Sequence, residues 1–476
     1  MKKVCLIAYI YKKPDFKQFF DDFADAAESN GYQVSALHLG VEEDETHAYE
    51  VTALPLACSW SCVSQFYLRN ANEKLPEPLR SVVDFEPQHI RKVGRSGVES
   101  ILCNFLVYLR NYLQKQKPEF VILGHQFSSQ HQVALHACRE LGIPVLFNHP
   151  GVVPGTMAFE AGGQMAESEI LRKRSSYEVI PIEDRDRECA RDYLQIYQGG
   201  RLTRPGKSSS IDASELNVLK LLKSQGECCV LYAGIADFRT GVQPRSYSES
   251  EVHSPWVKST GHGLKHLIAI SEKQNFKIIF KPHPLGPPIN RELVKHENVY
   301  SIERVPIDVL LKYAACFITI CSSSVYEALL HQVPAVLLGR MQAEMLGQVA
   351  AVAGVDELSA AVEERINSKV EYQHEEFVEH LALLLQHYYL KSDSAIADLP
   401  MADSRDFWEG IDQRVEQARE YFGKVEAEPV GKENATVGFQ VRFMAKMMLH
   451  FAKGEWRMVR ASIASEMKFL FMKSSS

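Results

Sequence analysis

The feature that most constrains the fold of this chain is a repeated alternation between short apolar runs and segments with helical periodicity. Residues 4–10 form a continuous apolar run, and residues 15–30 carry large apolar side chains on one helical face. The alternation restarts with the run CCVLYAGI at 228–235 and continues to CFITI at 316–320. Strands that alternate with helices are typical of parallel sheets covered by helices. The sequence therefore predicts an α/β fold with two Rossmann-like domains that face a cleft, followed by a helical C-terminal extension.

The predicted boundary between the two domains lies in GGRLTRPGKSSSID at 199–212, a stretch rich in Gly, Pro and Ser. This composition is typical of linkers, and 476 residues are too many for one ordinary hydrophobic core. We expect a first domain at 1–205, a second domain at 206–390 and a helical extension at 391–476.

The composition narrows the classes of function. A net charge of −7, with 46% apolar and 24% charged residues, is typical of a soluble globular enzyme and argues against a general nucleic-acid binder. The ten cysteines fit no zinc or disulfide framework, so we expect no bound metal and a reducing cytoplasm. The N-terminal MKKVCLIAYIYKK lacks a small-residue cleavage site and indicates a first strand instead of a signal peptide. No apolar stretch is long enough to predict a membrane-spanning helix.

The C-terminal segment 437–473 has the composition of a basic amphipathic helix. It carries seven Lys or Arg residues against two Glu residues, together with many Phe and Met residues. Such a helix fits an anionic membrane surface, where each nearby cation contributes about 1 kcal/mol. The alternative is that these helices pack on a Rossmann-like domain or on a second copy of the chain. We expect a cytoplasmic protein. If the segment binds a membrane, we expect a peripheral contact at the inner face of the cytoplasmic membrane.

Two strand-type segments in the second half end in residues suited to bind a phosphate. KIIF at 277–280 is followed by the cationic donors of KPHP at 281–284. CFITI at 316–320 is followed by serines at 322–324 and then by a helical pattern. Ligands of open α/β sheets lie outside the carboxyl ends of the strands, and a helix that begins with serines offers hydroxyl and N–H donors to an anion. The residues expected to hold a nucleotide phosphate are Lys281, His283, Ser322, Ser323 and Ser324.

Two further segments place charged residues where a sheet would end. The loop GVVPGTMAFEAGGQMAESEI at 151–170 is rich in glycine and polar residues and contains Glu160. Loops of this kind at the carboxyl edge of a sheet commonly carry function, although a mobile surface loop is the alternative interpretation. The predicted strand at 228–235 is followed by Asp237 and Arg239, which we expect at the same edge of the second sheet.

These motifs resemble the donor half of GT-B glycosyltransferases, because the serines are followed by Glu327 and Ala328 and then by VPAV at 333–336. KPHP ahead of the serines is similar to bacterial capsule polysaccharide biosynthesis proteins, especially retaining β-Kdo transferases, and more distantly to the HP and SS motifs of CMP-sialic acid transferases. The loop at 151–168 resembles a Gly, Pro-x-Thr, acidic, Gly, Ser pattern of those capsule proteins. This chain departs from that family in having His149 and Glu160 where a glutamate and an aspartate are expected.

The resemblance implies a retaining glycosyltransferase that transfers Kdo from CMP-Kdo to a surface glycan such as capsule polysaccharide or lipopolysaccharide. It implies that residues 1–205 bind the glycan or glycolipid acceptor and residues 206–390 bind the nucleotide-sugar donor. Glu327 would bind the ribose. No cofactor or metal besides the donor, and no nucleic acid, is expected.

The chemistry of such a donor assigns roles to the charged residues. The enzyme must neutralise the phosphate of the leaving CMP, for which Lys281 and His283 are suited. Arg239 or Arg245 could pair with the sugar carboxylate. Retention requires a carboxylate nucleophile or a front-face route. The expected catalytic residues are Asp237 as nucleophile, Glu160 as general base for the acceptor hydroxyl, and His283.

Each of these roles has an alternative. Asp237 could be a turn or helix-cap residue, Glu160 a partner in a loop salt bridge, and His283 a core histidine. The fold could also serve a CDP-glycerol-type polyol-phosphate transferase or a UDP-hexose transferase. A non-catalytic GT-B-like subunit that binds glycan or scaffolds a synthesis complex is the alternative of another class.

Overall fold

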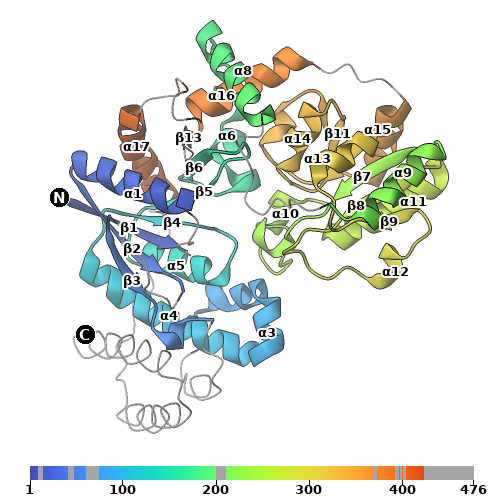
Figure 1. Cartoon of the computed structure of the whole chain (residues 1–476). Coiled ribbons are helices and arrows are strands. Elements are labelled where there is room, and N and C mark those ends of the chain that lie inside the picture. The colour runs from blue at the N-terminus through green and yellow to red at the C-terminus, as the bar shows by residue number, and fades with distance from the viewer. Residues whose placement is uncertain are drawn as a thin grey trace. The chain divides into compact units, whose positions relative to one another are not determined.

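The computed structural model describes residues 1–8, 14–40, 48–60, 74–199, 211–367, 373–391, 396, 399 and 404–422. The chain divides into two compact units. Unit 1 comprises Met1–Asn148 with Ser404–Ser476, and unit 2 comprises His149–Asp403. Parallel strands and helices make up each unit (Figure 1), which confirms the predicted α/β class with two Rossmann-like parts.

Unit 1 contains five strands in the order β5-β4-β1-β2-β3, and their described pairings are parallel. The strands are β1 (Lys2–Ala8), β2 (Tyr32–His38), β3 (Glu50–Ala53), β4 (Phe120–Leu123) and β5 (Val145–Pro150). The apolar runs of β1 and β4 are buried, as expected for parallel strands covered on both faces. The boundary between the units falls within β5.

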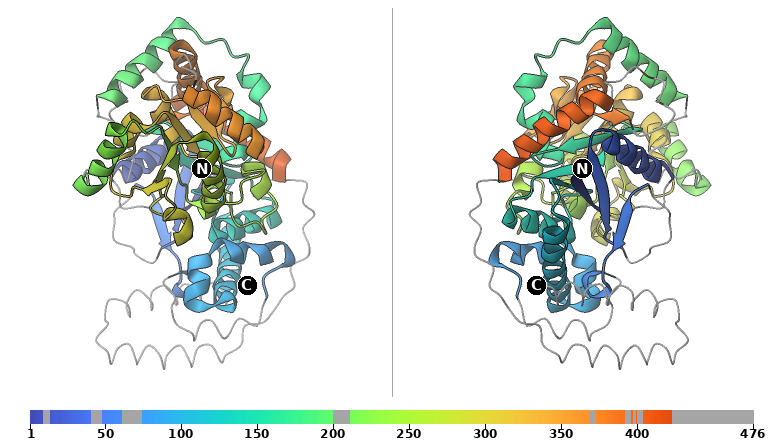
Figure 2. Two further views of the ribbon diagram at one scale, coloured as in Figure 1. Left: turned by 90° about the vertical axis from the view of Figure 1, so that its right-hand side faces the viewer. Right: turned by 90° about the vertical axis from the view of Figure 1, so that its left-hand side faces the viewer.

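The helices of unit 1 include one at the predicted position, since the helical pattern at 15–30 forms α1. They are α1 (Pro14–Ser29), α3 (Pro87–Val93), α4 (Arg95–Gln116), α5 (Ser129–Glu140), α17 (Ser404–Phe422) and the 3-10 helices η1 (Leu56–Cys58) and η2 (Glu77–Phe85). The longest of them, α4, is the blue-to-cyan helix in Figure 2. Helix α17 belongs to unit 1, where the Tyr32 hydroxyl donates to Asp412 Oδ1 at 2.7 Å.

Unit 2 contains a six-stranded sheet in the order β12-β11-β10-β7-β8-β9, with parallel pairing throughout. The strands are β7 (Cys229–Ala233), β8 (Lys277–Lys281), β9 (Val299–Ser301), β10 (Cys316–Thr319), β11 (Ala335–Leu337) and β12 (Val349–Ala351). The chain builds from β7 outward to β9, then crosses to the other side of β7 and continues with β10. The strand order therefore reverses between β7 and β10, which is where open α/β sheets bind ligands.

The remaining elements of unit 2 are mostly helical. The helices are α6 (Glu169–Arg172), α7 (Arg174–Tyr177), α8 (Asp184–Gln198), α9 (Ala213–Ser224), α10 (Ser250–His253), α11 (Thr260–Gln274), α12 (Arg291–Val294), α13 (Ile307–Leu310), α14 (Ser324–Leu330), α15 (Val355–Asn367) and α16 (His374–His387). The 3-10 helices are η3 (Met165–Glu167), η4 (Asp237–Arg239), η5 (Leu311–Tyr313) and η6 (Gln342–Met345). The short strands β6 (Thr156–Glu160) and β13 (Leu390–Lys391) pair antiparallel.

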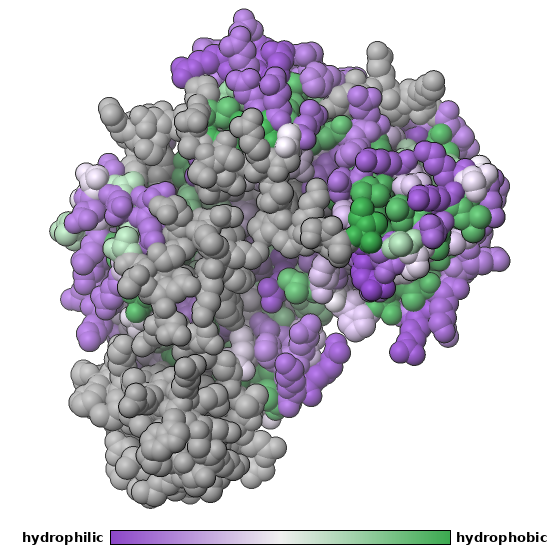
Figure 3. Space-filling model, in the orientation of Figure 1, coloured by the Kyte–Doolittle hydropathy of each residue, from purple (hydrophilic) through white to green (hydrophobic). Residues whose placement is uncertain are grey.

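This division of the chain differs from the predicted domains, because residues 149–199 belong to unit 2. Helix α8 contacts α16 through Arg187 and Glu379, whose charged atoms lie 2.8 Å apart, and Figure 3 shows α8 as a hydrophilic surface at the top. Most of the predicted linker, residues 200–210, lies outside the described residues. The predicted boundaries at 205 and 390 stay a prediction about which parts fold independently.

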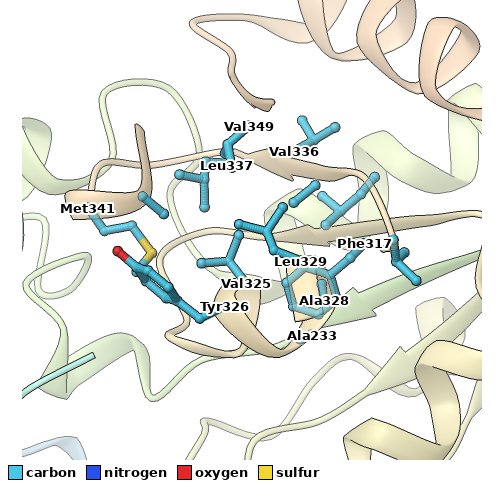
Figure 4. Close-up of a cluster of buried hydrophobic side chains, with 14 of the residues drawn as sticks. Ala233, Phe317, Val325, Tyr326, Ala328, Leu329, Val336, Leu337, Met341 and Val349 are labelled. Atoms are coloured by element: carbon cyan, nitrogen blue, oxygen red, sulfur yellow. The ribbon is translucent and has the colours of Figure 1, made fainter. Parts of the chain in front are cut away.

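The core of unit 2 supports the start of α14, where several predicted site residues lie. Figure 4 shows Val325, Ala328 and Leu329 of α14 among apolar side chains of the neighbouring strands, including Phe317 and Val336. All five are buried. Burial of one large aliphatic side chain stabilises a fold by about 1.5–3 kcal/mol, so this face fixes α14 on the sheet.

Among the described residues, no helix combines the length and apolarity that crossing a membrane requires. The predicted amphipathic segment 437–473 lies outside the described residues.

Candidate functional site

The carboxyl edge of the unit 2 sheet brings the predicted phosphate-binding segments to one side of one sheet. Strand β7 lies between β10 and β8, so the serines at 322–324 and KPHP at 281–284 follow the strands on either side of it. Backbone hydrogen bonds extend this edge, since the Gly234 N–H donates to the Lys281 carbonyl at 2.9 Å. Both segments therefore lie close to the reversal of strand order between β7 and β10, where open α/β sheets bind ligands.

His283 presents a defined hydrogen-bond donor at this edge. Its Nδ1 accepts a hydrogen bond from the Leu285 N–H at 3.0 Å. A neutral imidazole that accepts at Nδ1 carries its proton on Nε2. Burial lowers the pKa of His283, and the nearby Arg239 lowers it further. His283 is therefore neutral near pH 7 and can donate from Nε2 to a ligand.

The two predicted arginines differ in what they contact. Arg239, at the end of η4, is exposed, and its guanidinium makes no hydrogen bond or ion pair with any described residue. Arg245 donates from one guanidinium nitrogen to the carbonyls of Ser254 at 3.0 Å and Val257 at 2.7 Å. Arg245 thus supports the loop after β7, and Arg239 is the arginine able to bind an anion.

Lys281 contacts the neighbouring loop of the protein. Its ammonium donates to the Glu303 carbonyl, and burial lowers the pKa of Lys281 while Glu215 and Glu303 raise it. The Glu215 carboxylate also accepts from the backbone N–H groups of Glu303 at 3.2 Å and Arg304 at 2.7 Å. Lys281 therefore holds the loop after β9.

The serines at 322–324 form the start of α14, as predicted. The Ser322 hydroxyl accepts from the Ser324 N–H at 3.2 Å. Ser323 is the N-cap residue, and its side chain makes no capping hydrogen bond. The seven-residue helix α14 ends at Leu330, and Gln332 then adopts a positive φ of 57° shortly before β11 begins.

Glu327 lies in the first turn of α14 but contacts a residue from another helix. The Tyr197 hydroxyl of α8 donates to Glu327 Oε1 at 3.0 Å, and Glu327 is only 5% exposed. A ribose that binds Glu327 would have to share its carboxylate with the Tyr197 hydroxyl or displace that hydroxyl.

Asp237 is completely buried at the start of η4. Its carboxylate accepts from the Thr260 N–H at 3.0 Å and from the Thr260 hydroxyl at 2.6 Å, at the first turn of α11. Burial raises the pKa of Asp237, and the two Thr260 contacts lower it. This geometry is that of a carboxylate that fixes a helix start, and a nucleophilic role would require it to leave Thr260.

Glu160, the other predicted acid, is also completely buried and belongs to unit 2. Its Oε2 accepts from the Glu169 N–H at 2.7 Å, and its Oε1 lies 3.8 Å from His149 Nε2. The predicted general base thus contacts the start of α6 and a histidine.

Sequence reasoning missed the partners that hold these residues. Thr260, Tyr197 and Glu303 lie far along the chain from the site residues they contact, and no local motif identifies them. No group of three or more potential metal ligands is present in the part of the chain that the structure describes.

No protein-family model matches the chain, and no curated protein matches it. Solved structures with similar arrangements include the β-Kdo 2,7-transferase of Thermosulfurimonas dismutans KpsC, at 16% identity and a TM-score of 0.37 over 65% of this chain and 88% of that chain. The β-Kdo 2,4-transferase of the same KpsC matches at 14% identity and a TM-score of 0.41 over 61% and 89%. The UDP-GlcNAc 2-epimerase of Methanocaldococcus jannaschii with UDP-GlcNAc and UDP matches at 13% identity and a TM-score of 0.35 over 81% and 99%. Identities and TM-scores this low identify neither the family nor the activity of this chain.

Proposed function

We propose that this protein is a glycosyltransferase that binds a nucleotide-sugar donor at the carboxyl edge of the unit 2 sheet. The observation that carries the proposal is the position of Arg239 and His283 after the adjacent strands β7 and β8. Arg239 is exposed, its guanidinium makes no hydrogen bond or ion pair with any described residue, and His283 carries a donor on Nε2. Charge-assisted hydrogen bonds of this kind are the strong contacts to phosphate oxygens.

The proposed donor is CMP-Kdo, which rests on the resemblance of the KPHP and serine motifs to retaining β-Kdo transferases. The same edge would then hold one phosphate and one sugar carboxylate, and Arg239 suits either anion through bidentate contacts. The hydroxyls of Ser322, Ser323 and Ser324 are the proposed neutral donors to the phosphate. Lys281 would contribute indirectly, through the loop it contacts.

For the chemical step we propose Glu160 as the group that accepts the proton of the acceptor hydroxyl, which requires that its carboxylate, completely buried in this structure, become accessible to the acceptor. Asp237 would serve as nucleophile only if its carboxylate leaves Thr260, whereas a front-face route requires no nucleophile. His283 would stabilise the charge that develops on the leaving phosphate. No metal takes part in this scheme, so transfer should be unchanged in excess EDTA.

The proposed acceptor is a surface glycan or glycolipid, and the proposed location is the cytoplasm or the inner face of the cytoplasmic membrane. Binding of the full chain to vesicles with anionic lipids, compared with neutral vesicles, tests the membrane contact. Equal partition to both vesicle types would contradict it.

Nucleotide release from CMP-Kdo, CDP-glycerol and UDP-hexoses by the full chain tests the donor class. We expect CMP release from CMP-Kdo, with tighter calorimetric binding of CMP than of UDP. Preferential turnover of CDP-glycerol or a UDP-hexose would assign the corresponding alternative transferase. Glycan binding without binding of any nucleotide would favour the non-catalytic subunit.

A further inference from the structure

We infer that His253 is a positioning residue. Through a buried contact with Glu167, it holds the Gly-rich loop after β6 at the carboxyl edge of the donor-binding sheet. The role of this contact in transfer rests on the proposed function, whereas the contact itself does not. His253 ends α10, and Glu167 ends η3, 86 residues earlier in the chain.

The contact is polar and buried. His253 has no exposed surface, and its Nε2 lies 3.1 Å from Glu167 Oε2. A buried imidazole is costly unless its polar atoms form hydrogen bonds. A leucine would fill much of the same volume, so the presence of a histidine indicates that the hydrogen bond to Glu167 matters.

Two glycines make room for His253, and both lie in loops that follow strands of this sheet. A Cβ at Gly241 would lie 2.4 Å from the His253 ring, and Gly241 also has a positive φ of 77°. A Cβ at Gly339 would lie 2.6 Å from the His253 carbonyl oxygen. The same carbonyl accepts from the Arg340 N–H at 2.9 Å. His253 therefore contacts the segments after β7 and after β11 as well as Glu167.

A short series of contacts leads from His253 to the proposed phosphate site. The Gly339 N–H donates to the Ile320 carbonyl at 3.0 Å, two residues before Ser322. On the other side, Glu167 lies in the loop that follows β6, which ends at Glu160. The Glu160 side chain accepts from the Glu169 N–H, two residues beyond Glu167. The buried contact between His253 and Glu167 thus fixes two loops relative to each other. One is the loop after β6 that orients Glu160, and the other is the loop that leads to the serines.

Hydrogen exchange of the full chain, followed by mass spectrometry without any ligand, tests this anchor. We expect the exchange of segments 161–170 and 335–342 to increase about tenfold or more in His253→Leu, because a buried hydrogen bond to a charged acceptor is lost. His253→Gln should remain within about threefold of wild type, because a glutamine Nε2–H can replace the lost donor. Glu167→Ala should resemble His253→Leu in segment 161–170, and it provides the same test if the leucine variant does not fold.

The matched control is His296→Leu, because His296 lies 3.2 Å from Glu272 in a half-exposed contact of the same unit. We expect no change in either segment. Unchanged exchange of 161–170 in folded Glu167→Ala, or failure of His253→Gln to restore it, would overturn the positioning role.

A second readout separates this inference from the proposed function. In Glu167→Ala we expect the turnover number with CMP-Kdo to fall about tenfold, because small misplacements of a catalytic group have effects of this size. The dissociation constant for CMP should change less than about threefold, because Arg239 and His283 lie on other segments. Equal loss of CMP affinity and turnover would contradict the role in positioning Glu160. If wild type neither binds nor hydrolyses any nucleotide-sugar, the proposed function fails, and the exchange experiment still decides whether the anchor exists.

Discussion

The segments after β8 and after β10 lie on either side of β7, yet they present different chemistry to a ligand. After β8, His283 carries a donor on Nε2, with the exposed Arg239 close enough to lower the pKa of His283. After β10, the polar groups are hydroxyls and the Glu327 carboxylate, and Glu327 already contacts Tyr197 at 3.0 Å. A phosphate needs donors that the protein has not used itself, so the first segment is suited to charge-assisted contacts with the phosphate, and the second offers only the neutral hydroxyl donors of its serines.

The charged residues near these strand ends also differ in whether their side chains contact other groups of the protein. Asp237 and Lys281 lie next to Arg239 and His283 in the chain, but each contacts a group of the protein: Thr260 for Asp237 and the Glu303 carbonyl for Lys281. A charged residue at the end of a strand is therefore not by itself a ligand-binding residue.

The largest expected effect is on stability. Asp237→Ala leaves the Thr260 donors at the start of α11 without their buried acceptor, which should destabilise unit 2 by about 2–4 kcal/mol. Calorimetry should show a melting temperature lower by about 5–10 °C. Asp237→Asn keeps an oxygen acceptor and should lose less. Full turnover of CMP-Kdo by Asp237→Asn would exclude a nucleophile, whereas stable, CMP-binding but inactive protein would support one.

Acid should weaken the support of α14. His380 of α16 is buried beside Tyr326, 2.9 Å from its hydroxyl, and burial lowers the pKa of His380 from 6.5 to about 4. The unfolded chain binds this proton below pH 6.5 and the folded chain does not, so stability falls as the pH drops from 6.5 to about 4. The full difference corresponds to about 3 kcal/mol. Melting temperatures across this range should decline less steeply in His380→Phe, and identical slopes in both proteins would contradict the assignment.

The two neighbouring cations should differ in nucleotide binding. Arg239→Gln should raise the dissociation constant for CMP about tenfold or more, because a charge-assisted contact is lost. Lys281→Gln should raise it less than about threefold, because Lys281 contacts the Glu303 carbonyl. Calorimetric titrations of both variants measure this difference. A larger loss in Lys281→Gln than in Arg239→Gln would reverse the comparison.

The smallest expected effect concerns the segment after β10. Tyr197→Phe removes one hydrogen bond to Glu327, which should lower stability by about 1 kcal/mol. CMP affinity should change less than about twofold, because Tyr197 contacts Glu327 and not the proposed phosphate site. Loss of CMP binding in Tyr197→Phe, measured by the same titration, would contradict this and would mean that Tyr197 contributes to nucleotide binding, directly or through Glu327.

The elements of the fold could be predicted because their signals are local. The apolar run at 228–235 became β7 (Cys229–Ala233), and the helical pattern at 15–30 became α1 (Pro14–Ser29). Parallel strands buried on both faces leave continuous apolar runs in a sequence, and a helix leaves its 3.6-residue period. The division into units was harder to predict from the sequence, because contacts such as that of Arg187 with Glu379 join residues 192 positions apart.

The positions of the candidate residues relative to the strands could be predicted, but their contacts could not. The sequence placed Asp237, Arg239, Lys281 and His283 at strand ends, and the structure has them there. Their partners are set by tertiary packing: Thr260 is 23 residues from Asp237, and Glu303 is 22 residues from Lys281. Only these partners distinguish a residue that supports the loops from one that can bind a ligand.

The most direct test of the central claim is a structure of the full chain with CMP. We expect the phosphate within about 2.7–3.1 Å of His283 Nε2 and of the Arg239 guanidinium, with Lys281 still donating to the Glu303 carbonyl. A phosphate bound by Lys281 and distant from both His283 and Arg239, or bound in unit 1, would contradict it.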